Sequence, residues 1–452
     1  MKNMQRGYLE TLRIICMSLL MLAVDPLWAR DFMCNGWTYT VLDEQAGVCG
    51  LKKINDDNRA VIKIPSTVHD GSKSYKVASI LEYAFYHCEN LTEVKIPDSV
   101  KEIGSSAFSD CENLIEVKIP KSVKEIGSSA FLGCSSLVKV RLPKHLKVIR
   151  DWAFKECTSL TKVIIPETVE TIEAMAFHRC ESLNCLKLPE SLDLIGYAAF
   201  VMCNGLRSVT IPERVSYLDG SVFTSINLEE IIVHSRNQSF VAVDGILFSK
   251  NLTRLVCYPA AKSDTSYTIP YGVKSIASGA FANNRNLTDV VIPETVKSIG
   301  VEAFAFSRSL RTIELHDSLS SNYAFNFSWC DSLKTVRFTN PRNISFYKSN
   351  NIERVFYTGE KPERGYVGMF DEEVYNKATL YVRKSILDDL RDLEPWCKFR
   401  KIEILEFSIP TTRVVETGIA GNRCEQASCN DAPGSECTVE KAVFDGGDTR
   451  NE

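Results

Sequence analysis

The chain repeats one pattern of hydrophobic and polar positions every 23 residues. Residues 91–113 and 114–136 are identical at 17 of 23 positions. In the first copy, Val94 and Ile96 flank Lys95, and this alternation predicts a short strand whose lysine faces outward. Near-identical neighbouring segments are typical of stacked structural turns, because each turn needs the same residue at the same place.

The rest of each copy predicts a coil that closes on itself. Pro97 ends the strand because proline cannot continue a ladder, and a second short strand leads to Gly104, where a tight bend is easiest. Ala107, Phe108 and Cys111 then fit one turn of helix that points the ring inward. One unit cannot bury its apolar face alone, so stacked copies should share one core. The pattern therefore predicts an α/β solenoid of short parallel strands and brief helical turns.

The copies extend over most of the chain. The well-matched copies begin at nine leucines: Leu91, Leu114, Leu137, Leu160, Leu183, Leu206, Leu287, Leu310 and Leu333. Residues 228–269 break the rhythm with a hairpin-like Asp-Gly turn and a longer loop. We interpret this segment as an inserted turn and not as a domain boundary. Because an open solenoid exposes its core at each end, a cap is predicted at both ends.

The flanking segments complete the expected organisation. The first thirty residues place basic side chains before an apolar run that closes near Ala29, which is typical of a signal peptide, with a buried N-terminal helix as the alternative. The last forty or so residues are polar. The predicted segments are a signal peptide at 1–30, an N-terminal cap with a β-hairpin at 31–80, the solenoid at 81–340, degenerate repeats and a strand–helix–strand cap at 341–407, and a flexible tail at 408–452.

Eleven of the sixteen cysteines fall into two groups. Six recur with the repeat, each three positions after a phenylalanine: Cys88, Cys111, Cys134, Cys157, Cys180 and Cys203. Stacked turns would place them about 5 Å apart with parallel side chains, which favours a ladder of buried thiols over cross-linking, the alternative. Cys34 with Cys49 are better disulfide candidates. So are three cysteines of the tail, whose spacing also leaves a metal site open although no histidine lies there: Cys424, Cys429 and Cys437.

Composition and motifs argue against several classes of function. The net charge of -4 gives no global basic field, so no nucleic-acid partner is expected. After the N-terminal apolar run, no segment approaches the ~18 apolar residues of a membrane span. The six histidines form no HExxH motif, and no phosphate-binding glycine loop is present. We therefore expect no enzymatic activity, no cofactor and no metal.

Outward positions of the first strand form two columns with one residue per turn. The column two residues after the conserved leucine reads Glu93, Glu116, Lys139, Lys162, Cys185 and Ser208. The neighbouring column reads Lys95, Lys118, Arg141, Ile164, Lys187 and Thr210. Stacked like charges repel and no core requires them, so the charged members are candidate ligand-binding residues for acidic protein segments or sulphated sugars. The alternative is a solvated sheet face that duplication copied together with the core.

Three bulky residues mark a second candidate surface. Trp152, Met175 and Tyr197 lie in the region where the earlier copies carry serine. Exposed aromatic residues often anchor a partner, so these three are candidate binding anchors. The alternative is that they pack against a neighbouring turn.

The motif Leu-x-x-Val-x-Ile-Pro, followed in register by Ile-Gly-x-x-Ala-Phe and the terminal Cys, resembles that of the BspA-like leucine-rich repeat proteins over about residues 60–405. These are exported surface proteins. The resemblance implies a right-handed leucine-rich-repeat coil and adhesion to host extracellular-matrix or plasma proteins, to surface glycans or to other cells. No catalytic residues belong to the family pattern.

These observations favour an exported, noncatalytic binding protein that is monomeric and is secreted or associated with the outer membrane at the cell surface. The alternative is an envelope or periplasmic scaffold that holds the cell's own partners. An enzyme with its site in the 228–269 insertion is the least favoured hypothesis, because no cluster of catalytic residue types lies there.

Overall fold

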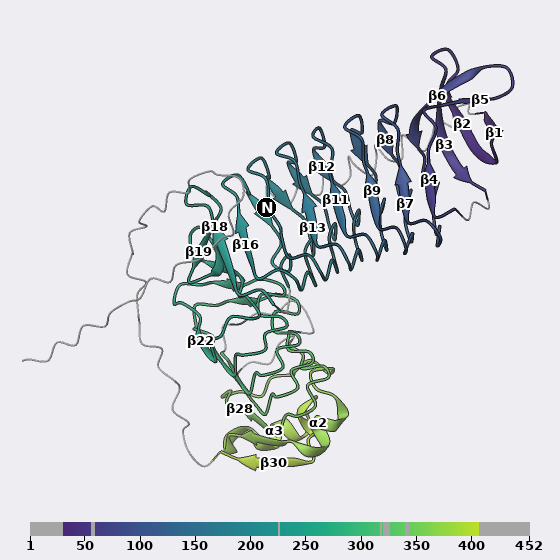
Figure 1. Ribbon diagram of the computed structural model, residues 1–452. Helices are drawn as coiled ribbons and strands as arrows, with labels where there is room; N and C mark the ends of the chain where they lie inside the picture. The colour runs from purple at the N-terminus through teal and green to yellow at the C-terminus, as the bar shows by residue number, and fades with distance from the viewer. Residues whose placement is uncertain are drawn as a thin grey trace, which may run out of the picture. The chain divides into compact units, whose positions relative to one another are not determined.

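The computed structural model describes residues 30–55, 59–224, 227–316, 319, 326–339 and 344–405. The predicted signal peptide and the predicted tail, with its three cysteines, lie outside these residues. The described residues form a parallel β-solenoid, in which equivalent strands of successive copies pair side by side. Figure 1 shows these strands following one another along the array from β4 to β13.

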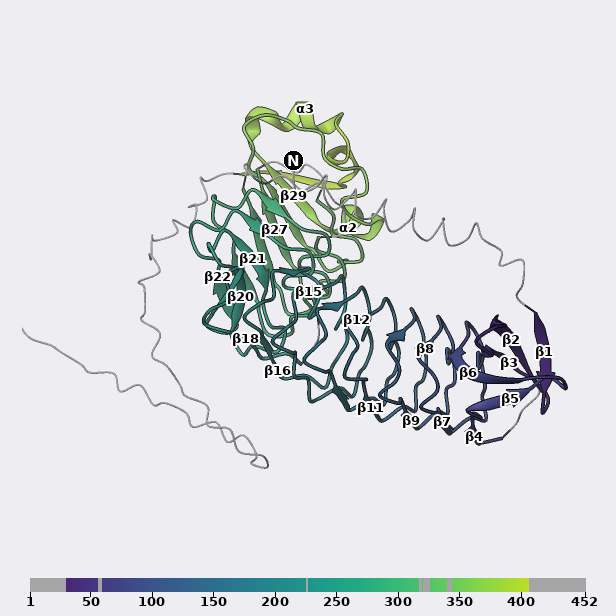
Figure 2. The ribbon, with the colours of Figure 1, turned by 90° about the horizontal axis from the view of Figure 1, so that it is seen from above.

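The first strands of the copies form one row of the coil. In the N-terminal part, the paired strands are β4 (Val61–Lys63), β7 (Glu93–Lys95), β9 (Glu116–Lys118), β11 (Lys139–Arg141) and β13 (Lys162–Ile164). A separate pair follows, formed by β16 (Ser208–Ile211) and β18 (Glu230–Val233). The later sheet, part of which is labelled in Figure 2, contains β22 (Ser266–Thr268), β24 (Asp289–Val291), β26 (Thr312–Leu315), β27 (Thr335–Phe338), β28 (Arg354–Tyr357), β29 (Thr379–Val382) and β30 (Lys401–Ile404).

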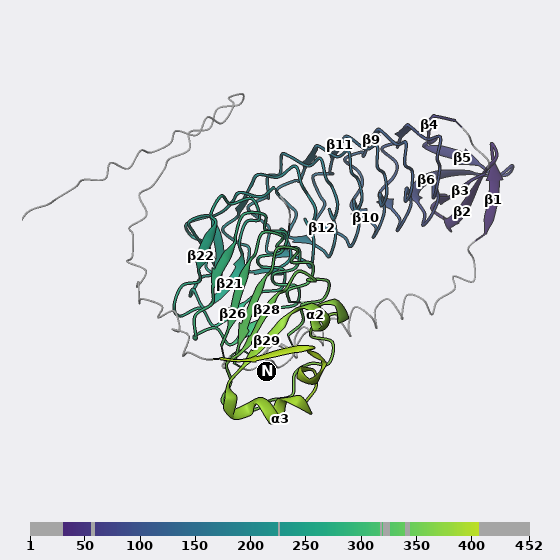
Figure 3. The same ribbon diagram turned by 90° about the horizontal axis from the view of Figure 1, so that it is seen from below.

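The second strands form another row, and Figure 3 shows β10 and β12 on the opposite side of the coil from β9 and β11. The N-terminal sheet of this row contains β1 (Asp31–Cys34), β2 (Trp37–Asp43), β3 (Val48–Ile54), β5 (Thr67–His69), β6 (Ser74–Ile80), β8 (Glu102–Ile103) and β10 (Glu125–Ile126). The next sheet contains β12 (Val148–Ile149), β14 (Thr171–Ile172), β15 (Leu194–Ile195) and β17 (Tyr217–Leu218). The last contains β19 (Phe240–Val243), β20 (Ile246–Ser249), β21 (Arg254–Cys257), β23 (Ser275–Ile276) and β25 (Ser298–Ile299).

The corner that follows the second strand is not the predicted turn of helix. Ser106 and Asp110 adopt left-handed backbone angles, with φ of 50° and 59°, and an α-helix cannot accommodate such residues. Successive N–H groups of the corner instead donate alternately to the next copy and to their own copy. The Phe108 N–H donates to the carbonyl of Ala130 in the next copy at 2.8 Å, and the Ala107 N–H donates to the carbonyl of Gly104 in its own copy. The corner therefore adds a third hydrogen-bonded ladder between copies.

Among the described residues, helix occurs only between 372 and 398. The predicted α/β class is therefore only loosely supported, because the described parts of the repeats contain strands and turns but no helix. The helical elements are α2 (Glu372–Lys377), η1 (Lys384–Ile386), α3 (Leu387–Arg391) and η2 (Trp396–Lys398). The predicted strand–helix–strand ending is confirmed as β29, α3 and β30.

The glycine at the bend lets neighbouring copies approach closely. A Cβ on Gly104 would lie 2.7 Å from the backbone nitrogen of Glu82, so a larger residue would not fit there.

Stacked aromatic rings fill the centre of the coil. The first stack places seven buried rings on successive turns at centroid separations of 4.7 to 5.7 Å: Phe85, Phe108, Phe131, Phe154, Phe177, Phe200 and Phe223. The second stack has separations of 4.7 to 5.2 Å and contains Tyr258, Phe281, Phe304, Phe327, Phe346 and Phe370. The inward position predicted for the phenylalanine is confirmed.

The repeat cysteines are free thiols, which confirms the ladder interpretation. Each of five thiols donates to the carbonyl of a phenylalanine in the preceding copy at 3.0 to 3.2 Å: Cys111, Cys134, Cys157, Cys180 and Cys203. The proposed pairing of Cys34 with Cys49 is wrong, since both are free. Cys34 lies on β1 opposite Trp37 and Cys49 lies on β3 opposite Val41, so strand β2 runs between the two strands that carry them.

The insertion at 228–269 contains the hairpin expected at Asp244-Gly245. β19 and β20 pair antiparallel, and the two turn residues have φ of 51° and 71°, as a tight two-residue turn requires. Strand β20 of the insertion is buried on both faces: Leu247 contributes to the N-terminal hydrophobic cluster and Phe248 to the C-terminal one. The insertion therefore separates two cores along the solenoid.

Candidate binding surface

The predicted columns exist because the first strands pair in parallel without a shift in register. Glu93 lies opposite Glu116, and Lys139 lies opposite Lys162. The central residue of each strand is buried: Val94, Val117, Val140 and Val163. Since side chains alternate along a strand, the residues on either side of each valine must face outward. The strand alternation thus positions the candidate residues by the same rule in every turn.

The eight predicted site residues all lie on this outward face, which we call the strand face. Seven are exposed, and Glu93 is half-buried: Glu93, Lys95, Glu116, Lys118, Lys139, Arg141, Lys162 and Lys187. Lys187 follows Cys185, which forms an isolated parallel bridge to Lys162 and so continues the columns beyond β13.

The charge along the strand face is not uniform. On the first two of these turns each lysine pairs with the glutamate two residues before it: Lys95 Nζ lies 3.4 Å from Glu93 Oε1, and Lys118 Nζ lies 3.6 Å from Glu116 Oε1. Within the described part of the chain, no carboxylate lies within ion-pair distance of the basic side chains on the next three turns: Lys139, Arg141, Lys162 and Lys187. Uncompensated positive charge is therefore concentrated on residues 139–187, and the predicted basic stripe is neutralised at its start.

One strand of this face escaped the sequence-based prediction. β4 pairs with β7, so Lys63 lies opposite Lys95 and Val61 opposite Glu93. The signal was present in the sequence, since Val61-Ile62-Lys63-Ile64-Pro65 matches the strand and proline of the repeat. The predicted N-terminal cap at 31–80 includes this segment.

The bulky corner residues are largely exposed. Trp152 and Tyr197 have 44% and 54% of their surface accessible, so both can contact a partner, whereas Met175 is half-buried. The amine of Lys155 lies 5.5 Å from the centre of the Trp152 ring, a cation–π arrangement. Trp152 also adopts a left-handed conformation, with φ of 58°, which the corner imposes on whichever residue stands there.

Two further properties of the described residues concern metals and membranes. Among them, no three or more His, Cys, Asp or Glu side chains are placed to hold a metal ion together. None of the helices in the described segments is long and apolar enough to cross a membrane. The arrangement supports noncovalent recognition by repeated charges on a rigid scaffold.

A parallel β-solenoid built from a 23-residue repeat with leucine at a fixed position is the architecture of a leucine-rich repeat protein. The sequence profile described as "BspA type Leucine rich repeat region (6 copies)" matches residues 71–153, 133–251 and 257–361. The chain belongs to this family, as its motif suggested. No protein with a curated description matches the chain.

Solved structures share the fold. A leucine-rich cell surface protein from Faecalibacterium prausnitzii A2-165 is 24% identical, with a TM-score of 0.58 over 83% of this chain and 94% of that one. The pneumococcal vaccine antigen PcpA is 22% identical, with a TM-score of 0.58 over 84% of this chain and 99% of that one. A leucine-rich repeat protein from Bacteroides ovatus ATCC 8483 is 23% identical, with a TM-score of 0.55 over 83% of this chain and 100% of that one.

Proposed function

We propose that this protein is an exported, noncatalytic binding protein that attaches to a large protein or glycan through its strand face. The observation that carries the proposal is a group of basic side chains on three successive turns that have no ion-pair partner among the described residues: Lys139, Arg141, Lys162 and Lys187. A rigid ladder holds them at fixed spacing, so a partner with repeated negative charges gains several contacts without ordering the protein.

The partners that fit this face are host extracellular-matrix or plasma proteins and surface glycans that carry acidic groups. We place the protein outside the cell or on its surface, after cleavage of a signal peptide within residues 1–30, and expect it to act as a monomer. A solved structure of the same fold is described as a leucine-rich cell surface protein, which supports this location.

We also propose the segment boundaries and the capping. Residues 31–80 and 341–407 would cover the two ends of a right-handed coil at 81–340, with the tail at 408–452 outside it. The stacked rings support this assignment, because an uncovered end would expose a ring such as Phe85 or Phe370 to water.

Protease treatment of intact cells tests the location. A surface adhesin is removed by the protease, whereas an envelope or periplasmic scaffold is spared until the outer membrane is opened. Protection in intact cells would therefore reject adhesion and favour the scaffold.

The strand face is tested separately by charge reversal. Lys139→Glu combined with Arg141→Glu and Lys162→Glu should weaken binding to acidic partners and remove its salt sensitivity. A matched variant, Lys95→Glu with Lys118→Glu, alters turns whose charge is already balanced and should have the smaller effect. Equal affinity of both variants and the unchanged protein would reject the strand face as the binding site.

A further inference from the structure

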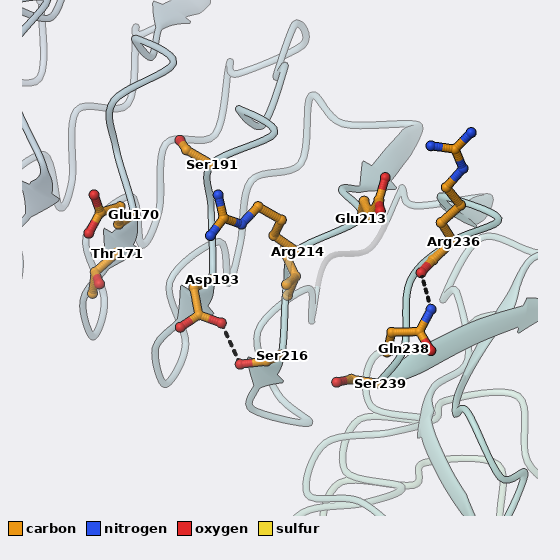
Figure 4. A pocket seen from close by; sticks show the side chains of 11 residues that line it. Glu170, Thr171, Ser191, Asp193, Glu213, Arg214, Ser216, Arg236, Gln238 and Ser239 are labelled. Atoms are coloured by element: carbon orange, nitrogen blue, oxygen red, sulfur yellow. Dashed lines mark hydrogen bonds between the residues drawn. The ribbon is translucent and has the colours of Figure 1, made fainter.

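A groove of about 530 Å³ lies on the second row of strands, away from the strand face. Its walls come from the residues that begin β14, β15 and β17, from the turn at 213–216 and from the loop that opens the insertion. Figure 4 shows the side chains of these segments lining it. The volume falls within the range of small-ligand sites.

The loop that closes one side of the groove is fixed by a buried asparagine. Asn237 is fully buried, and its amide nitrogen donates to the carbonyls of Pro212 and Val215 at 2.8 and 3.0 Å. Its amide oxygen accepts from the backbone N–H groups of Ser239 and Phe240 at 2.8 and 2.7 Å. Because every hydrogen-bonding site of the amide is used, the loop is held against the 212–216 turn, and the groove is preformed.

The carboxylates in the groove already have partners. Glu170 pairs with Lys147 at 2.7 Å, and Asp193 accepts a hydrogen bond from the hydroxyl of Ser216. Glu213 lies 3.7 Å from the ring nitrogen of His234. Each of these carboxylates therefore has a partner of its own within the protein, and among the described residues none of them forms an ion pair with an arginine of the groove.

The two arginines in the groove differ from the acids. Arg214 and Arg236 are both exposed, and no carboxylate among the described residues lies within ion-pair distance of either guanidinium. Figure 4 shows Arg214 reaching toward the turn that carries Asp193, with Arg236 on the opposite wall. A guanidinium offers a planar pair of donors that suits a carboxylate or sulphate group.

The remaining lining is polar and rich in hydroxyl and amide groups, including Ser191, Ser239 and Gln238, and its one apolar residue, Val215, is itself buried. We propose that the groove binds an acidic oligosaccharide: the arginines hold its carboxylate or sulphate groups, and the hydroxyl and amide side chains bond its hydroxyls. A peptide is less suited, because the groove offers no apolar pocket for side chains. This site goes beyond the proposed function, since it shares no residue with the strand face.

The test compares Arg214→Gln/Arg236→Gln with the unchanged protein and with Arg311→Gln, a matched control at an exposed arginine outside the groove. Titration calorimetry would measure binding of galacturonate oligomers, heparin oligosaccharides, neutral dextran oligomers and an oligoglutamate peptide, with thermal unfolding as a check of folding. Loss of two charged contacts should weaken binding of an acidic sugar at least about tenfold in the double variant and leave the control unchanged.

Comparing the ligands identifies the anionic group of the sugar that the groove binds. Binding of galacturonate alone assigns a carboxylate, and binding of heparin alone assigns a sulphate. Four results would overturn the proposal: no binding of either acidic sugar, equal affinity in the double variant, equal binding of dextran, or tighter arginine-dependent binding of oligoglutamate. The arginine variants are therefore also compared in the Lys139→Glu/Arg141→Glu/Lys162→Glu background, in which the strand face no longer contributes. Acidic-sugar binding that remains in this background and is lost with Arg214→Gln/Arg236→Gln belongs to the groove, so failure of the strand face and failure of the groove are distinguishable.

Discussion

The two aromatic stacks fill the coil in the same way, but the second stack has serine in place of some of the cysteines beside the ring. In the first stack, a cysteine thiol donates to the preceding phenylalanine carbonyl on five successive turns, as Cys157 does to Phe131. In the second stack, Ser307 donates to Phe281 at 2.9 Å and Ser349 to Phe327 at 2.6 Å, whereas Cys330 donates to Phe304 at 3.2 Å as in the first stack. The comparison teaches that cysteine and serine both provide a small hydrogen-bond donor at this position, so the cysteine of the repeat acts here as a donor and not as a cross-link.

The largest expected effect comes from the rings themselves, where the two stacks should behave alike. Phe131→Ala and Phe327→Ala each open a cavity between buried neighbours and should lower the free energy of unfolding by ~3–5 kcal/mol. Urea denaturation measures the loss. Phe306→Ala serves as the control, since that ring is 37% exposed and its removal opens no closed cavity. A variant at 131 with full stability would contradict its place in the core.

A smaller loss of stability is expected when the hydrogen-bond donor is removed and the aromatic ring is kept. Cys157→Ala and Ser349→Ala leave a buried carbonyl with one partner fewer and should each cost ~1–3 kcal/mol. Cys157→Ser and Ser349→Cys keep a donor and should cost less than the alanine variants. Chemical denaturation of the four variants gives the comparison. If serine at 157 destabilised as much as alanine, the two stacks would not be equivalent at this position.

The thiols should make stability depend on alkaline pH in a way that serine does not. Burial raises the pKa of Cys157, and it raises the pKa of Cys330 to about 12. An unfolded thiol titrates near ~8.5, so above that pH the unfolded chain releases protons that the folded chain retains. The stabilisation is therefore complete below about pH 8.5 and is lost progressively as the pH rises.

Denaturation of reduced protein over this pH range measures the effect. Cys157→Ser should remove about 1 kcal/mol of the decline one pH unit above the unfolded pKa. An identical decline in the serine variant would show that Cys157 contributes nothing to the pH dependence.

The smallest effect on stability is expected at the surface, where neighbouring turns differ in charge. Lys139→Glu/Arg141→Glu/Lys162→Glu should change the free energy of unfolding by no more than about 0.5 kcal/mol per residue, because these side chains are exposed and unpaired. Thermal unfolding beside the matched Lys95→Glu/Lys118→Glu variant measures this. A large loss would show that the strand face contributes to folding.

The sequence was sufficient to predict the core, the strand register and the outward columns. Residues 23 positions apart are equivalent, so they pair side by side and share the same burial. Ala107 and Phe108 point inward whether their corner is a helix or a series of tight turns, so the pattern could not separate the two. The left-handed angle at Ser106 is set by ladder bonds between copies, which the sequence of one copy does not reveal.

The electrostatics of the surface were harder to predict. The repeat showed Glu93 and Lys95 two positions apart, but only the alternation of an extended strand brings them to one face at pairing distance. The groove depends on Asn237 folding an irregular loop against another turn, and no periodic signal marks such a contact.

Binding of the chain from residue 31 onward to an array of matrix proteins, plasma proteins and glycans, at low and high salt, tests the central claim most directly. The account predicts at least one acidic ligand whose affinity falls with salt and falls again in the Lys139→Glu/Arg141→Glu/Lys162→Glu variant. No ligand in the array, or a ligand unaffected by salt and by that variant, would contradict recognition through the strand face and favour a scaffold for partners in the cell's own envelope.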